Sequence, residues 1–118
     1  MPALNPDLVA IYNALCSQQD ALSAQIQQTT DPAMADTIST EIQEIAHRIL
    51  LAQNLLFKAD DPRLTTLAAS VASSSQKLTT AIGQITQVTN FLNSVSSFLA
   101  VVDQAIDLAK TLAAAAAA

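Results

Sequence analysis

Tryptophan is absent from this chain of 118 residues, and the other aromatic side chains are limited to one Tyr and three Phe. Cysteine and glycine each occur once, as Cys16 and Gly83. A single cysteine excludes an intramolecular disulfide framework and a cysteine-rich zinc site. With one glycine in the whole chain, and with the β-branched residues at helical spacing, the sequence favours helices over strands.

Basic residues are also few. Five Lys and Arg stand against ten Asp and Glu, which gives a net charge of -5 at pH 7. This charge opposes binding to phosphate backbones and to anionic lipid surfaces, so we expect no nucleic-acid partner. Most of the remaining polar residues are Gln, Ser, Thr and Asn, which leaves a weakly charged surface on which copies of the chain can associate.

One four-residue pattern, Asn or Asp followed by Pro, any residue, and Leu or Met, occurs three times, at residues 5–8, 31–34 and 61–64. In each copy the Asn or Asp side chain can accept hydrogen bonds from the amides that follow it, as an N-cap does. Pro then occupies the first helical position, where its missing N–H costs nothing. The three copies therefore predict three helix starts.

The predicted fold is all-α: an up-down-up-down antiparallel bundle of three to four helices, in one domain over residues 1–112. Hydrophobic residues make up 51% of the chain, which is enough for one modest core. The expected helices cover about 6–29, 32–59, 62–88 and 90–112, and links of two or three residues between the first three would make consecutive helices antiparallel neighbours.

No fourth copy of the capping pattern marks the start of a last helix. Two alternatives stay open. The chain breaks near Gly83 or near Thr89 and Asn90, with Asn90 as an N-cap, or one long last helix continues from Pro62. The alanine run at 113–118 extends the helix by propensity but says nothing of packing, and it is either native or a non-native addition.

The helix that begins near Asn90 is unusually apolar, and its hydrophobic residues cover well over half of the helical circumference. Such an arc is covered by a bundle, by a second subunit or by a membrane surface. A transmembrane span is excluded, because Asp103, Asp107 and Lys110 interrupt the apolar run. The residues predicted to form a partner or oligomer interface on this helix are Phe91, Leu92, Val95, Phe98, Leu99, Val102, Ile106 and Leu112.

Two polar residues fall in the middle of apolar stripes, Gln19 in the first helix and Ser75 in the third. Packed helices would bring them together. A buried polar pair of this kind either fixes the register of the helices or is an ordinary interior contact satisfied by backbone or water.

Candidate residues for chemistry are sparse. Glu41, Glu44 and His47 have the Glu-x-x-His spacing of carboxylate-bridged metal sites, but the helical wheel turns them away from the core isoleucines. Arg48, one turn after Glu44, indicates a solvated face with an i,i+4 ion pair. Asp103, Asp107 and Lys110 are interpreted as an exposed strip.

The other candidates also have structural explanations. Cys16 is expected to be a half-buried hydrophobic residue, Asp60 closes a turn, and Asp61 caps the third helix. No phosphate-binding loop or nucleophile elbow is present. We therefore expect no enzymatic activity, no cofactor and no metal.

The sequence thus predicts a non-enzymatic helical protein–protein interaction module, such as an adaptor, small chaperone, inhibitor or self-assembling subunit, that uses the apolar face of its last helix. Its partner is another protein or a second copy. The alternative is a membrane-active helical protein in which this helix lies on or enters a bilayer. Met1 to Leu4 are too short and uncharged for a signal peptide, so a cytoplasmic location is the default expectation, although a leaderless secreted protein would share these features.

Overall fold

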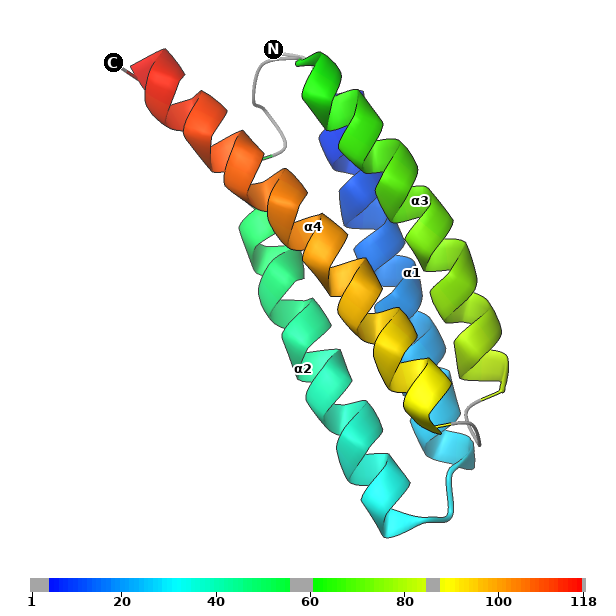
Figure 1. The fold of residues 1–118 in the computed structure, drawn as a ribbon. Helices are drawn as coiled ribbons and strands as arrows, with labels where there is room; N and C mark the ends of the chain where they lie inside the picture. The colour runs from blue at the N-terminus through cyan, green and yellow to red at the C-terminus, as the bar shows by residue number, and fades with distance from the viewer. Residues whose placement is uncertain (1–4, 56–60, 85–87, 118) are drawn as a thin grey trace.

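The computed structural model describes residues 5–55, 61–84 and 88–117, and it describes side chains over the same ranges except at residues 88 and 113–117. Within these residues the chain forms four helices: α1 (Pro6–Gln28), α2 (Pro32–Gln53), α3 (Pro62–Gly83) and α4 (Val88–Ala117). The all-α fold predicted from the sequence is confirmed, and the helices alternate in direction along one long bundle (Figure 1).

The repeated capping pattern acts as predicted at the start of α1, α2 and α3. The Asn5 side chain accepts from the backbone N–H groups of Asp7 and Leu8 at 2.9 and 3.0 Å. Asp31 Oδ1 accepts from the N–H of the second residue after it at 3.0 Å, and Asp61 Oδ1 does the same at 2.8 Å. Each cap satisfies amides that have no partner inside the helix, which fixes where the helix begins.

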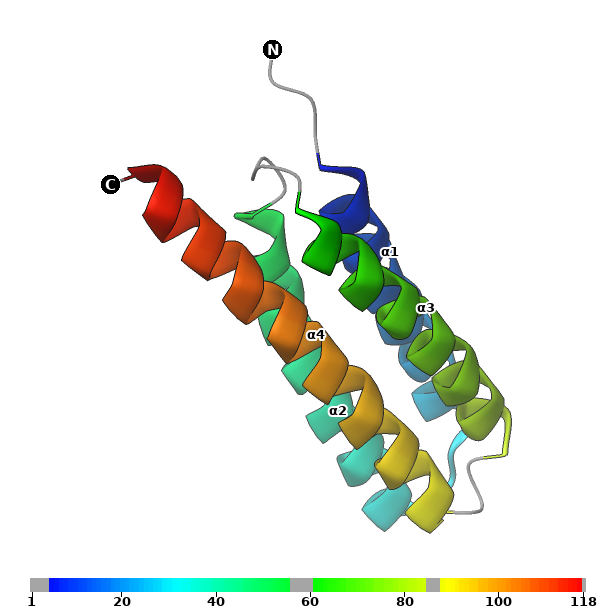
Figure 2. The same cartoon turned by 45° about the horizontal axis from the view of Figure 1, so that its top comes forward.

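Neighbours in the sequence are not always neighbours in space. α1 packs beside α2 and α3, α3 packs beside α4, and α2 and α4 contact each other more sparsely. Consequently α2 and α3 lie across a diagonal of the bundle, as the views in Figures 1 and 2 show. The expectation that every pair of consecutive helices packs as antiparallel neighbours is therefore wrong for α2 and α3. The two pairs α1·α3 and α2·α4 are parallel.

α2 ends earlier than the sequence predicted. Its last helical residue is Gln53, whereas the sequence predicted a helix to residue 59. After Asn54 the chain turns, and Leu55 packs into the core with 8% of its surface exposed. The last residue of α2, Gln53, and the first of α3, Pro62, therefore lie further apart in the sequence than the predicted link of two or three residues allows. The rest of the predicted extension, residues 56–59, lies outside the described residues.

The helix that begins at Pro62 does not continue to the end of the chain but ends before α4 begins. Of the two alternatives, the structure therefore has two helices rather than one long last helix. α3 ends at Gly83, one of the two predicted positions. The predicted N-cap at Asn90 is wrong, because α4 already begins at Val88 and Asn90 lies within its first turn. The three residues between Gln84 and Val88 are outside the described part of the chain.

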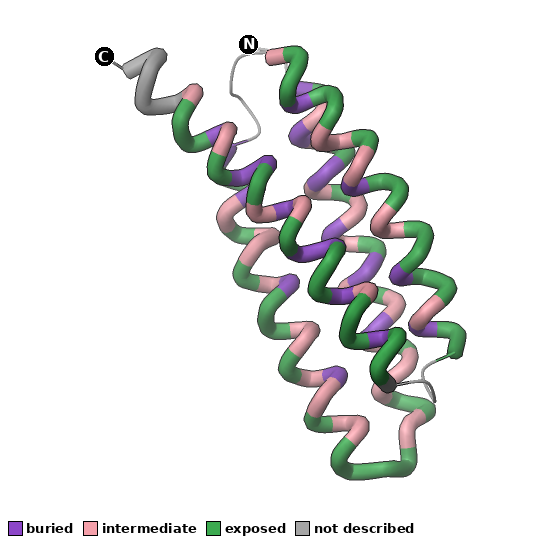
Figure 3. Tube along the Cα trace, viewed as in Figure 1, coloured by how far each residue is buried: buried purple, intermediate pink, exposed green. Residues whose placement is uncertain are grey.

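The core runs along the axis of the bundle (Figure 3) and has a seven-residue spacing typical of helices packed nearly parallel. Each helix supplies at least one such series of buried residues: Leu8, Leu15 and Leu22; Ile38, Ile45 and Ala52; Leu64, Val71 and Leu78; Phe91, Phe98 and Ala105; and Val95, Val102 and Ala109. α4 contributes two complete series, which explains why its apolar arc is the widest.

A polar contact crosses the core between α1 and α3. Gln18 is 2% exposed, and its side-chain nitrogen lies 3.0 Å from the Ser75 carbonyl oxygen, 2.7 Å from Ser75 Oγ and 2.9 Å from Thr79 Oγ1. The sequence predicted Gln19 in this place. Gln19 is only half-buried, because the α1 core face follows Leu8, Leu15 and Leu22 and takes in Gln18 on its α3 side.

Candidate functional site

Most of the residues predicted to form an interface on α4 are buried within the chain itself. Phe91, Phe98 and Val102 have no exposed surface, and Val95, Leu99 and Ile106 are 2%, 8% and 3% exposed. Leu112 is half-buried. Leu92 stands apart, because it is 37% exposed. In the single chain the apolar arc of α4 is thus chiefly the inner face of a bundle helix, and Leu92 marks the part that is least covered.

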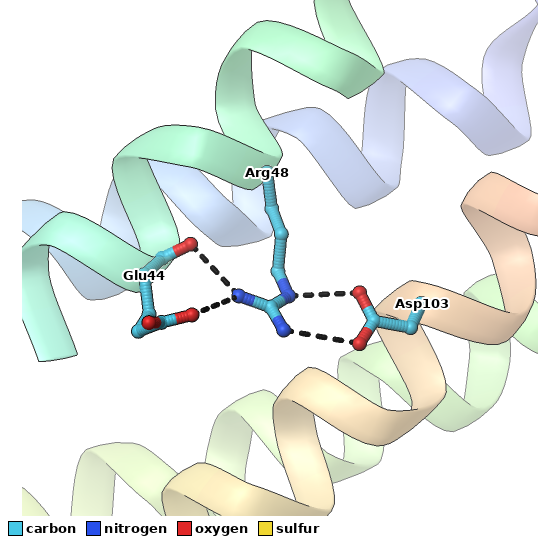
Figure 4. Close-up of polar contacts among 3 residues, drawn as sticks. All are labelled: Glu44, Arg48 and Asp103. Carbon is cyan, nitrogen blue, oxygen red and sulfur yellow. Dashed lines mark hydrogen bonds and ion pairs between the residues drawn. The ribbon is translucent and has the colours of Figure 1, made fainter.

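The flank of α4 on which Leu92 lies faces α2. Leu92, Leu99 and Ile106 are spaced by seven residues, and Asp103 lies one turn after Leu99 on the same flank. Asp103 accepts two hydrogen bonds from Arg48 of α2, from Nε at 2.8 Å and from Nη2 at 3.0 Å (Figure 4). This two-point contact fixes which sides of the two helices meet.

Arg48 also bonds within its own helix. Its Nη1 donates to the Glu44 carboxylate at 3.0 Å and to the Glu44 carbonyl oxygen at 2.9 Å. The predicted i,i+4 ion pair is therefore confirmed, but the predicted solvated position is wrong for Arg48, whose side chain is only 14% exposed. The hydrogen bonds that Arg48 donates, first to Asp103 and then to Glu44, raise the pKa of Arg48, which stays charged although burial opposes this.

Asp103 was predicted to lie on an exposed strip with Asp107 and Lys110. The structure corrects this: Asp103 is half-buried and paired with α2, whereas Asp107 and Lys110 are exposed. The contact was missed because its partners are 55 residues apart. One signal was available. Arg48 belongs to the seven-residue series Met34, Glu41, Arg48 and Leu55, which has apolar residues at both ends.

We call the contact line between α2 and α4 the seam, and define it by Met34, Glu41 and Arg48 of α2, by Leu55 just after α2, and by Leu92, Leu99 and Asp103 of α4. It is the most sparsely packed of the four helix contacts described above. Glu41 is half-buried in it, and burial is the main cause that raises its pKa above the ordinary value of 4.5. The charge of Glu44 adds to this shift, and Arg48 opposes it.

The residues with metal-like spacing are not gathered into a site. His47 is exposed, whereas Glu41 faces the seam. Among the described residues there is no group of three or more His, Cys, Asp or Glu that could hold a metal ion. Cys16 is half-buried, as predicted.

The N-terminal ends of α1 and α3 border a hollow of about 590 Å³, lined by Pro6, Asp7, Asp61, Pro62, Thr65 and Thr66. Its acidic groups already have partners. Asp7 accepts from Thr65 Oγ1 at 2.7 Å, and Asp61 pairs with Arg63 at 2.9 Å. The hydrogen bonds from Arg63 hold the pKa of Asp61 below its ordinary value. Asp60 lies outside the described residues.

Over the described residues, no helix is both long enough and apolar enough to cross a bilayer. Comparison of the chain with family models, with curated proteins and with solved structures gives no match. The features that bear on function are therefore those of the chain itself: an all-α bundle whose α2 and α4 are joined sparsely, by an ion pair and a partly exposed apolar edge.

Proposed function

We propose that the protein is a non-enzymatic helical interaction module, and that it binds its protein partner through the flank of α4 that faces α2. The observation that carries this proposal is the uneven packing of the bundle. α4 packs tightly on α3, and α1 packs tightly on both its neighbours, but the α2 flank of α4 is covered sparsely and leaves Leu92 37% exposed.

The composition of the seam supports the same proposal. A closed bundle needs only apolar residues at such a contact, and charged groups there cost desolvation that their pairing only partly returns. The seam nevertheless holds Glu41 and Arg48 from α2 and Asp103 from α4. Contacts of this kind are weaker and more exchangeable than an apolar core, which suits a seam that opens to another helix.

Site-specific photo-cross-linking tests the proposal. A photoreactive phenylalanine analogue at Leu92 is compared with the same analogue at Ser73, an exposed residue of α3. We expect a defined cross-linked product from position 92 in cells that contain the natural partner, and none from position 73. Equal products from both positions, or none from either, would contradict the proposal.

Two further measurements separate the kinds of partner. Light scattering on a sizing column over a range of concentrations identifies a second copy of the chain as the partner if the mass rises to that of a dimer or larger species. Release of dye from neutral vesicles tests the membrane-active alternative, since the acidic chain gives no reason for a preference for anionic lipids. The proposal predicts no release.

A further inference from the structure

Glu41 is a carboxylate of the seam, and the one cation near it, Arg48, already donates its hydrogen bonds to Asp103 and Glu44. It lies seven residues before Arg48 and therefore on the same side of α2, because seven residues are close to two helical turns. Arg48 reaches Asp103, so this side of α2 faces α4 (Figure 4). Glu41 is half-buried there, and no hydrogen bond or ion pair joins it to another described residue.

The described helices packed against α2 place no second cation at the level of Glu41. α1 contains no Lys or Arg. α4 contains only Lys110, seven residues beyond Asp103 in the direction in which both helices run. Since Arg48 and Asp103 mark one level of the seam, Lys110 lies about 14 residues, or about 21 Å, from the level of Glu41.

The remaining basic groups of the described chain are equally unsuited. Arg63 pairs with Asp61 at the start of α3. Lys77 is exposed on α3, which is diagonal to α2. Among the described residues, therefore, Glu41 has no Lys or Arg of its own, and a cation from another molecule can meet it at the seam. A second copy of the chain is a poor source, because each copy carries a net charge of -5.

An apolar contact lies near the same level. Residue 96 lies seven residues before Asp103 and is therefore the α4 position level with Glu41. Leu92 lies about one helical turn before residue 96. Leu92 is the partly exposed residue of this flank, so by register the seam offers a carboxylate from α2 and a leucine from α4 within about one helical turn of each other. Figure 2 shows the two helices side by side along this stretch.

We propose that the seam is occupied by an amphipathic helix of a different protein, which sets a Lys or Arg against Glu41 and its apolar residues against Leu92. This inference rests on the proposed function and specifies the chemistry of the partner. The half-buried carboxylate gives the partner a charge-assisted contact that is stronger than an exposed one, and the leucine adds a hydrophobic contact beside it.

A charge-swap experiment on the full chain tests this. The probes are two synthetic amphipathic helical peptides, one of Leu and Lys and one of Leu and Glu, with binding followed by fluorescence anisotropy. We expect the Lys peptide to bind the natural protein and to bind Glu41→Gln on the order of fivefold more weakly. Asp20→Asn is the matched control, since it removes the same charge from an exposed position on α1, and it should change the affinity less than twofold.

Glu41→Lys completes the swap. This variant should lose affinity for the Lys peptide and gain measurable affinity for the Glu peptide, a reversal that a simple closing of the seam cannot produce. Equal weakening by Glu41→Gln and Asp20→Asn would overturn the inference, because it would show attraction by net charge alone. If position 92 cross-links a partner while the Glu41 variants bind both peptides as the natural protein does, the inference fails and the proposed function stands.

Discussion

Gln18 of α1 and Ser75 of α3 form the polar contact at the centre of the bundle, and they satisfy each other incompletely. The side-chain nitrogen of Gln18 meets oxygens of Ser75 and Thr79, but its Oε1 is buried without a hydrogen-bond partner among the described residues. An unsatisfied buried acceptor costs about 1–3 kcal/mol. The contact therefore contributes more to the register of α1 against α3 than to stability.

The first prediction concerns Gln18. Gln18→Ala leaves a cavity in a fully packed layer and should lower the free energy of unfolding by about 2 kcal/mol. Gln18→Met fills the same space and removes the unsatisfied acceptor, so it should change stability by less than about 1 kcal/mol. Urea unfolding measures both. Gln19→Ala, at the half-buried neighbour, is the control and should have little effect. A Met variant as unstable as the Ala variant would show that the polar contact itself holds the helices together.

The second prediction concerns the ion pair across the seam. In a double-mutant cycle of Arg48→Met and Asp103→Asn, we expect a coupling free energy of about 1 kcal/mol, because Arg48 is largely buried and the contact has two hydrogen bonds. The cycle for Arg63→Met and Asp61→Asn is the comparison. Arg63 is 67% exposed, so its coupling should be below about 0.5 kcal/mol. Equal coupling free energies in the two cycles would show that the burial of Arg48 does not strengthen its ion pair with Asp103.

The third prediction is a pH dependence. Because the pKa of Glu41 is raised in the folded protein, the folded state keeps this proton to a higher pH than the unfolded chain does. The stability that the protonated form provides is complete below the ordinary value of 4.5 and is lost as the pH rises through the folded pKa. Glu41→Gln has no such loss.

Urea unfolding at several pH values measures this effect. The unfolding free energy of Glu41→Gln relative to the natural protein should therefore increase as the pH rises above 4.5. The charged groups that act on Glu41 are Glu44 and Arg48, and both stay unchanged in the variant. A difference in unfolding free energy that is constant with pH, or that shrinks as the pH rises, would show that the charged form of Glu41 is not disfavoured by its surroundings.

The fourth prediction separates the core face of α4 from the outer face of α2. Val102→Asp places a carboxylate at a position with no exposed surface, and Leu99→Asp places one at a position that is 8% exposed. Both should abolish cooperative thermal unfolding, as followed by circular dichroism, because an unpaired buried charge costs several kcal/mol. His47→Ala, at an exposed position, should change stability by less than about 0.5 kcal/mol. Equal tolerance of the three changes would contradict this burial pattern.

The sequence predicted the helix starts well and the contacts between helices poorly, for physical reasons. A cap such as Asp31 acts on amides two or three residues away, so its effect is visible in the local pattern. The end of α2 depends instead on Leu55 turning into the core, a tertiary contact that no local signal reports. The choice of Gln18 over Gln19 depends in the same way on which side of α1 faces α3.

The candidate site shows the same division. The pair of Glu44 and Arg48 follows from a spacing of four residues and was predicted. The pair of Arg48 and Asp103 depends on the diagonal placement of α2 and α3, which brings α2 beside α4, and was missed. The apolar arc on α4 was visible in the sequence. That the other helices of the bundle cover most of it could be assigned only once the fold was known.

The central claim, that a helix of another protein enters at the seam, is tested most directly by distances between spin labels. In a Cys16→Ser background, labels at the exposed positions Gln43 of α2 and Ala100 of α4 report across the seam, and labels at Ser17 of α1 and Gln76 of α3 report across the opposite side. On addition of the Lys peptide, the account predicts a longer or broader distance distribution across the seam and no change between α1 and α3. No change in either pair, or a change only between α1 and α3, would contradict it.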